Sequence, residues 1–209
     1  TAKALGKCRI VVCHEDESER PDALIRRTAD NRSLAHLKML HGVSSRLTRL
    51  LEIDEIGATV CDELRQLIDY HNCRVFLRDR DDLLPIAFRG DLTQGNELAL
   101  DVLATKVGVG VTGHVAATGE AFLTGDAAHC GIGHHIEGTA SIEESLLAVP
   151  LRYGSDVIGV LVISKLGLDQ FDEDDQRLLE VLAGHASVAL ANARLYEAAD
   201  ALGASKTRV

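Results

Sequence analysis

The stretch SLLAVPLRYGSDVIGVLVISK, residues 145–165, consists of two apolar segments separated by a short polar turn. Each segment has the length of a β-strand, and the turn between them, Gly154-Ser155-Asp156, is typical of a hairpin. Because both segments are almost continuously apolar, we expect them to be covered on both faces. This stretch therefore predicts an antiparallel hairpin at the centre of a sheet.

An earlier hairpin is predicted where the sequence takes on a period of two. In CRVFLRD (73–79) and LLPIAFRG (83–90), side chains of different character alternate, and RDD between them supplies a turn. Pro85 has no backbone N–H, so we place it on an edge of the sheet. A further strand is expected at 102–107, and a short one in EAFLT, residues 120–124.

Two helices are predicted before the first hairpin. Residues 33–51 carry apolar residues at spacings of three and four, which fits the seam of a short coiled coil and equally a helix packed on its own domain. Residues 54–69 form a second amphipathic helix, in which we expect Cys61 to serve packing rather than chemistry. The row in the first helix is Leu40, Val43, Leu47 and Leu50.

The chain ends in a predicted long helix. Asp172 is the expected N-cap, and the three acidic residues after it suit the positive end of the helix dipole. A shorter helix is expected in TGHVAATG, residues 112–119, closed by Gly119. One face of the final helix carries a stripe of mostly small side chains that would let another helix approach closely: Leu182, Ala186, Ala189, Ala193 and Tyr196.

These elements predict an α+β fold, with an antiparallel sheet of five or six strands flanked by helices and long helices at both ends. We divide the chain into an N-terminal extension or linker (1–32), a signalling and dimer helix (33–51), the folded domain (52–198) and a C-terminal tail (199–209).

The composition excludes several classes of partner. The formal net charge is −10 and aromatic residues make up only 3% of the chain, which disfavours nucleic acid and anionic membranes as partners. No apolar run reaches the roughly 18 residues needed to span a bilayer. The 5 cysteines are scattered, so we expect no disulfide framework and place the protein in a reducing cytoplasm. No G-x-S-x-G, H-E-x-x-H or P-loop motif occurs.

Three segments together resemble the GAF domain family, a sibling of the PAS fold. They are VGVGVTGHVAATGEAFLTGD (107–126), the hairpin at 145–165 and FDEDDQRLLEVLAGHASVALANARLYE (171–197). The resemblance implies a sheet with helices on one face and a ligand pocket on the other. It also implies dimerisation through the terminal helices, here 33–51 and 172–198, which lead to an output domain. We therefore expect a regulatory small-molecule sensor of a bacterial signalling protein, and not an enzyme.

The resemblance also distinguishes varieties of the family. Cyclic-nucleotide-binding members carry a lysine and an aspartate that form a bracing salt bridge, and Lys165 and Asp175 match those positions, although the flanking residues differ. Bilin-binding members use Cys followed by His, whereas the order here is His129-Cys130. This partial match therefore indicates a shared scaffold rather than a nucleotide or bilin ligand.

Two varieties stay open as alternatives. Free methionine sulfoxide reductase is a GAF enzyme with several cysteines around its pocket, for which Cys73 and Cys130 are a partial match. Haem-based gas sensors hold haem through one histidine in the segment before the central hairpin, where His134 and His135 stand.

The segment GDAAHCGIGHH, residues 125–135, is expected to be a lid over the ligand pocket. Its glycines allow movement, and its imidazoles can donate and accept hydrogen bonds near neutral pH. A metal site in this loop and a solvated loop without a specific role are the alternatives, and we expect no metal. The ligand itself is unknown. The residues expected to contact it are Phe88, Val111, Phe122, Thr124, Asp126, His134, His135, Ser145 and Leu147.

Overall fold

The structure is a computed structural model in which residues 42, 46–47, 49–92, 99–133 and 142–206 are described. All of them belong to one compact unit, Leu40–Val209. The predicted extension at 1–32, most of the predicted helix at 33–51, and the two histidines of the predicted lid, His134 and His135, lie outside the described residues.

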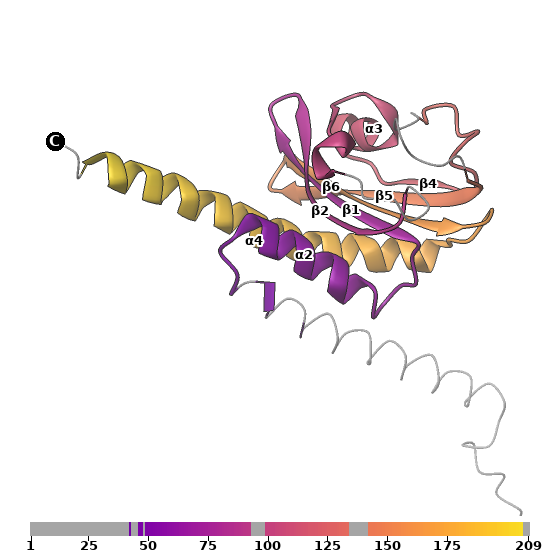
Figure 1. Cartoon of the computed structure of the whole chain (residues 1–209), viewed down its shortest axis with the longest axis horizontal. Coiled ribbons are helices and arrows are strands. Elements are labelled where there is room, and N and C mark those ends of the chain that lie inside the picture. Colours follow the sequence, from indigo (N-terminus) through magenta and orange to yellow (C-terminus); the bar gives the residue numbers. More distant parts are fainter. Residues whose placement is uncertain (1–41, 43–45, 48, 93–98, 134–141, 207–209) are drawn as a thin grey trace, which may run out of the picture. The chain divides into compact units, whose positions relative to one another are not determined.

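Six antiparallel strands form one sheet in the order β3-β2-β1-β6-β5-β4 (Figure 1). The predicted α+β fold is therefore confirmed. Along the chain the elements are α2 (Ile53–Leu64), β1 (Asn72–Asp79), β2 (Asp82–Gly90), the 3-10 helix η2 (Leu100–Leu103), β3 (Thr105–Lys106), α3 (Gly110–Thr118), β4 (Phe122–Thr124), β5 (Glu144–Tyr153), β6 (Asp156–Leu166) and α4 (Glu173–Lys206).

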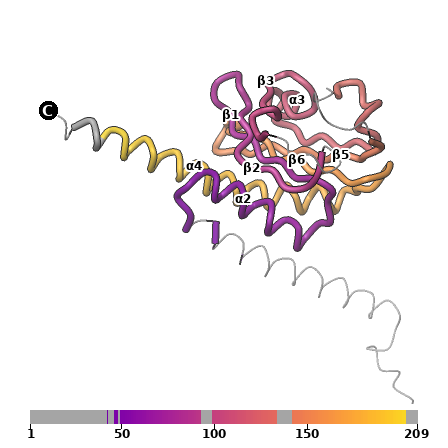
Figure 2. The backbone as a smooth tube through the Cα atoms, in the orientation of Figure 1, coloured from indigo at the N-terminus to yellow at the C-terminus, as the bar shows by residue number. Residues whose placement is uncertain are grey.

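Helices cover the sheet on both faces (Figures 1 and 2). Helices α2 and α4 pack side by side against one face, which we call the helix face, and α3 packs against β5 and β6 on the other, which we call the α3 face. Each face has its own apolar cluster, and the larger one lies on the helix face. None of the helices in the described part is both long enough and apolar enough to cross a bilayer.

The hairpin that decides the fold is β5–β6, and it lies where the sequence predicts. Strand β6 pairs with β5 on one side and β1 on the other. Gly154 takes a φ of 63° in the turn, a conformation that side chains with a Cβ rarely adopt. Gly159 is required because a Cβ there would overlap the carbonyl oxygen of Phe76 on the neighbouring strand.

The first hairpin is also confirmed, with Pro85 at an irregular, weakly paired position. The β1–β2 register shifts between Val75 and Phe76, opposite Pro85, and in the described structure β3 pairs with β2 only at Asp82 and Leu83. The strand predicted at 102–107 is shorter than expected, because its first two residues belong to the 3-10 helix η2. Leu103 of that helix is buried against the α3 face, which leaves two residues to pair as β3.

Helix α4 begins where predicted but ends later. The Oδ1 atom of Asp172 accepts hydrogen bonds from the backbone N–H groups of Asp174 (2.8 Å) and Asp175 (2.9 Å), which lowers the pKa of the Asp172 carboxyl. The helix continues to Lys206, so residues 199–206 are helical rather than a tail. Lys165 and Asp175 form the predicted ion pair at 3.3 Å, and the Lys165 ammonium also lies over the Phe171 ring.

The stripe of small residues on α4 belongs to the domain's own core. Tyr196 is exposed. The other four members of the stripe are buried on the helix face: Leu182, Ala186, Ala189 and Ala193. Their small side chains let α4 lie close to the sheet and α2. This face is therefore occupied within one chain and is not available to a second copy.

Leu47 is likewise part of the domain core. Its side chain is fully buried on the helix face, and its neighbour Arg46 forms an ion pair with Glu63 of α2. Of the two interpretations of this row, Leu47 supports the one in which the helix packs on its own domain, while Leu40 and Val43 lie outside the described residues.

We expect Leu47→Asp to lower the free energy of unfolding by about 4 kcal/mol or more, because it places an unpaired charge in an apolar core. Urea denaturation measures this change. Leu51→Asp is the matched control, since the same substitution falls on a neighbouring leucine that is half exposed. Equal stabilities of the two variants would contradict the burial of Leu47.

Candidate functional site

The α3 face carries an apolar cluster between the sheet and the segments that cross it. Strands β1, β5 and β6 contribute its floor, and Val111, Val115 and Ala116 of α3 cover that floor. Gly119, with a φ of 70°, ends α3 as predicted. The floor residues are Phe76, Leu146, Ala148, Val160 and Val162.

Four polar side chains interrupt this face at one end. Alternation along the strands places Asn72 and Arg74 of β1, Ser164 of β6 and Glu144 of β5 on the same side as Phe76, Val162 and Leu146. Asn72 and Ser164 are fully buried and paired across the sheet, and the Asn72 amide donates to the Ser164 hydroxyl at 2.6 Å.

Three buried atoms in this polar group have no hydrogen-bond partner. Within the described residues they are Asn72 Oδ1, Arg74 Nε and Glu144 Oε2. Buried polar groups in folded proteins are almost always paired, so an unpaired set gathered in one place points to a missing partner such as a ligand or bound water.

Arg74 carries the strongest electrostatic signal of the four. Burial lowers the pKa of its guanidinium, and the nearby Glu144 carboxylate acts in the opposite direction without forming an ion pair with it in the described structure. A buried guanidinium without a carboxylate partner is costly. Its planar donors fit a carboxylate or phosphate group. The Glu144 oxygen can accept a hydrogen bond from the same ligand.

Three of the predicted ligand-contacting residues lie on this face. Val111 is buried in the apolar cluster, and Phe88 and Phe122 pack against it. Phe88 is the cross-strand partner of Arg74. The Phe122 ring meets the His114 ring edge-on, with centroids 5.8 Å apart. These side chains form apolar walls beside the polar group.

Thr124 and Asp126 hold the following loop rather than presenting free groups. The Thr124 hydroxyl donates to the Asp126 carbonyl oxygen (2.9 Å) and accepts from its N–H (3.2 Å). The Asp126 carboxylate accepts from the backbone N–H groups of Ala128 and His129 and pairs with the His129 ring at 2.8 Å. The hydrogen bond to His129 lowers the pKa of Asp126. Both side chains are therefore committed to loop structure.

Ser145 and Leu147 lie on the other face of the sheet. Leu147 belongs to the helix-face core, and Leu146 and Ala148 take the positions toward α3. The Ser145 hydroxyl donates to the carbonyl oxygens of Gly125 (3.2 Å) and Gly167 (2.7 Å) and accepts from the N–H of Gln170 (2.9 Å). Ser145 and Leu147 are therefore on the opposite face from Val111, Phe88 and Phe122, and their contact with a ligand stays a prediction.

The cysteines divide between the two faces. Cys61 and Cys73 are buried neighbours on the helix face, which fits the packing role expected for Cys61. Burial, together with the adjacent Cys61 thiol, raises the pKa of Cys73 well above its usual range. Cys130 packs against the α3-face cluster and is partly exposed, with its thiol directed to the Ala127 carbonyl oxygen at 3.2 Å. Among the described residues no three potential metal ligands lie together.

Comparison with known proteins identifies the family. Residues 51–191 match the family model described as GAF domain. The chain belongs to the GAF domain family. The GAF domain of a phosphoenolpyruvate-protein phosphotransferase from Coxiella burnetii has a TM-score of 0.68 at 22% identity, with 78% of this chain and 96% of that chain covered. The corresponding domain from Acinetobacter has a TM-score of 0.66 at 20% identity, covering 76% and 94%.

Enzymes share this fold as well. A free methionine-R-sulfoxide reductase from Neisseria meningitidis, solved with its substrate, has a TM-score of 0.66 at 23% identity, with 79% of this chain and 93% of that chain covered. Two structures of such a reductase from Staphylococcus aureus match too. The expectation that this GAF domain is not an enzyme is therefore corrected: reductases share its fold, so the fold is compatible with enzymatic activity as well as with a sensor role.

Sequence reasoning missed the polar group around Arg74. Arg74 and Arg78 flank Phe76 at a spacing of two, so all three share one face of β1. Because a large aromatic side chain such as Phe76 is normally buried, its place between the two arginines was the available signal that this face of β1 is covered. Glu144 immediately precedes the predicted hairpin and was assigned to no element.

Proposed function

We propose that this GAF domain binds a small organic acid on its α3 face and transmits its binding to α4. The observation that carries the proposal is the set of three buried polar atoms without partners, on Asn72, Arg74 and Glu144, at the end of an otherwise apolar face. Ligand sites are commonly apolar, with a few such polar groups that fix orientation.

The side chains suggest the chemistry of the ligand. An anionic group would pair with the Arg74 guanidinium, and an N–H or O–H donor would satisfy Glu144. The rest of the molecule would lie against the Phe76 floor and the Phe88 and Phe122 walls. A small acid with both a donor and an apolar body, such as an amino acid or an acylated derivative, has these features.

Strand β5 connects this group to α4. Glu144 is followed by Ser145, whose hydroxyl bonds the backbone of Gly167 and Gln170 in the segment leading into α4. Leu147 of the same strand packs in the core formed with α4. A ligand that favours one position of β5 would therefore favour one position of the start of α4, which is the differential binding that signalling requires.

A thermal-shift screen tests the proposal. The panel contains amino acids, acylated amino acids, small carboxylic acids and small phosphates, and native mass spectrometry identifies any molecule that copurifies. We expect at least one acid to raise the melting temperature of the wild type and of Arg49→Met, an exposed arginine control, but not of Arg74→Met. A ligand that stabilises all three proteins equally, or a panel without any effect, would refute the site.

Free methionine sulfoxide reduction is the second candidate, favoured by the partly exposed Cys130 thiol on the same face. Attack of a thiolate on the sulfoxide would release the thioether and water once a second thiol forms the disulfide. The other described cysteines lie on the helix face, so an added dithiol would supply the second sulfur. Dithiol-dependent turnover that Cys130→Ser abolishes would assign the enzyme, and no turnover would leave the binding role.

Haem through His134 or His135 stays a prediction, because both residues lie outside the described part. The visible absorption spectrum of the purified protein tests it directly. A haem band that is lost in the double variant His134→Ala/His135→Ala would support haem and replace the organic acid as the ligand.

A further inference from the structure

A pocket lies at the opposite end of the sheet from Arg74. It has a volume of about 510 Å³ and is formed by the β1–β2 turn, the β5–β6 turn, the C-terminal end of α3 and one residue of α4. Arg78, at its rim, is four residues along β1 from Arg74, or about 13 Å at the rise of a strand. The pocket is therefore distinct from the polar group on the α3 face.

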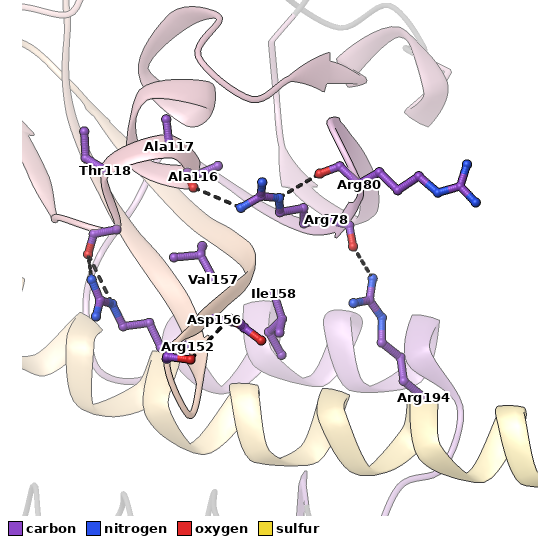
Figure 3. A pocket seen from close by; sticks show the side chains of 12 residues that line it. Arg78, Arg80, Ala116, Ala117, Thr118, Arg152, Asp156, Val157, Ile158 and Arg194 are labelled. Carbon is purple, nitrogen blue, oxygen red and sulfur yellow. Dashed lines mark hydrogen bonds between the residues drawn. The ribbon is translucent and has the colours of Figure 1, made fainter.

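Arginines dominate this pocket. Arg78, Arg80, Arg152 and Arg194 contribute to its lining, and Val157 and Ile158 are its apolar members from β6. In Figure 3, Arg78 reaches toward α3, Arg152 toward the end of that helix and Arg194 toward β1, while the Arg80 side chain extends away from the other three.

Within the described residues, the guanidinium groups of Arg78, Arg152 and Arg194 bond neutral backbone oxygens. Arg78 Nε donates to the Arg80 carbonyl oxygen at 2.7 Å, Arg152 Nε to the Gly119 carbonyl oxygen at 3.2 Å, and Arg194 Nη2 to the Arg78 carbonyl oxygen at 2.6 Å (Figure 3). These bonds hold three side chains in place and leave their remaining N–H groups available.

The positive charge of the pocket is not neutralised within the described structure. None of the four arginines has a carboxylate within ion-pair distance there, although other arginines of the domain do. Asp156 is the acidic member of the lining, and its carboxylate accepts the Ser155 hydroxyl at 3.3 Å. Asp79 and Asp81, on the same turn as Arg80, are exposed and outside the lining.

We propose that this arginine pocket binds a small phosphorylated molecule. Three fixed guanidinium groups from β1, β5 and α4 match the several oxygens and the double charge of a phosphate better than the two oxygens of one carboxylate. The volume lies within the range of small-molecule sites, and Val157 and Ile158 offer an apolar surface to the rest of the ligand.

The position of Arg194 gives such a site a regulatory consequence. Ala193 is buried under the sheet, whereas Leu195 and Tyr196 are each 61% exposed, so Arg194 marks the point where α4 leaves the domain. A phosphate held between Arg194 and the two hairpin arginines, Arg78 and Arg152, would fix α4 to both turns. The pocket is thus a second input to the helix, independent of the α3-face ligand.

Calorimetric titration of the full chain with inorganic pyrophosphate and tripolyphosphate, at constant ionic strength, tests the proposal. We expect saturable binding by the wild type and at least about tenfold weaker binding by Arg152→Gln/Arg194→Gln, because two charge-assisted contacts are lost. Arg177→Gln is the matched control, as it lies on the same helix about 25 Å away and pairs with Asp174.

The two proposed sites are separated by the same titration. Arg74→Met should bind pyrophosphate like the wild type, so failure of the α3-face site leaves this result unchanged. No saturable binding by the wild type, or equal weakening in Arg177→Gln, would overturn the arginine pocket. Loss of binding in Arg74→Met together with full binding by the double variant would overturn it as well and assign the anion to the α3 face.

Discussion

Arg74→Met is expected to abolish acid binding on the α3 face while raising the stability of the ligand-free domain. Within the described residues, Arg74 is buried, has no ion pair with a carboxylate and leaves its Nε atom without a hydrogen bond. Replacing buried charge by an apolar side chain of similar length is often neutral or stabilising by about 1–4 kcal/mol. The ligand meanwhile loses its charged partner, which costs an affinity factor of about 100 or more.

Chemical denaturation with and without the acid identified in the screen measures both effects. The wild type should gain stability with ligand concentration, whereas Arg74→Met should begin higher and gain nothing. Arg74→Lys is an informative second variant, since it keeps the charge and loses the planar fork, so we expect weakened rather than abolished binding. A marked loss of stability in ligand-free Arg74→Met would mean that Arg74 serves the fold and not a ligand.

The fold was predictable because its signals are local. The apolar length of β5 and β6, the glycine in their turn and the cap at Asp172 each specify an element within a few residues, and the structure contains each of them. The 3-10 turn at Leu100–Leu103 was missed because burial of Leu103 outweighs the strand-like composition of that segment.

The site was harder to predict because both faces of the sheet are covered. In a sheet with one exposed face, the alternation of polar and apolar residues shows which side chains point to solvent. Strand β5 is apolar on both faces, so the sequence does not show which of its side chains point to which face. The sequence therefore does not show that Ser145 and Leu147 lie on the helix face, whereas Leu146 and Ala148 lie on the α3 face. Arg74 was not singled out from the sequence, because a charged residue in a strand is normally exposed, whereas this one is buried.

Helix spacing was ambiguous in a similar way. A row of apolar or small residues at intervals of three and four predicts a packed face but does not say whether the partner is the same chain or another. Burial resolves this for α4, whose alanine row packs on the sheet. Apart from Tyr196, the exposed large apolar residues of α4 then stand out, because they recur every seven residues: Val181, Val188, Leu195 and Leu202.

We propose that this row of four apolar residues, spaced seven apart, pairs α4 with the α4 helix of a second copy. An exposed row at a strict seven-residue interval drifts by only about 20° per repeat on a straight helix, which supercoiling of two helices corrects. The row lies on the face of α4 opposite Ala186 and Ala193, so it points away from the core of the domain. Its members are 44–69% exposed, and burial against a second copy would cover them.

Val188→Glu/Leu195→Glu is therefore expected to weaken self-association by a factor of about 100 or more, because it brings like charges together in the seam and desolvates them. Sedimentation equilibrium over a concentration series measures the dissociation constant. Leu168→Glu is the matched control, since Leu168 is 43% exposed but lies outside α4. Neither site is buried in the domain, so circular dichroism of the double variant should retain the wild-type spectrum. A monomeric wild type, or a double variant that associates as tightly as Leu168→Glu, would show that the row on α4 does not join two copies.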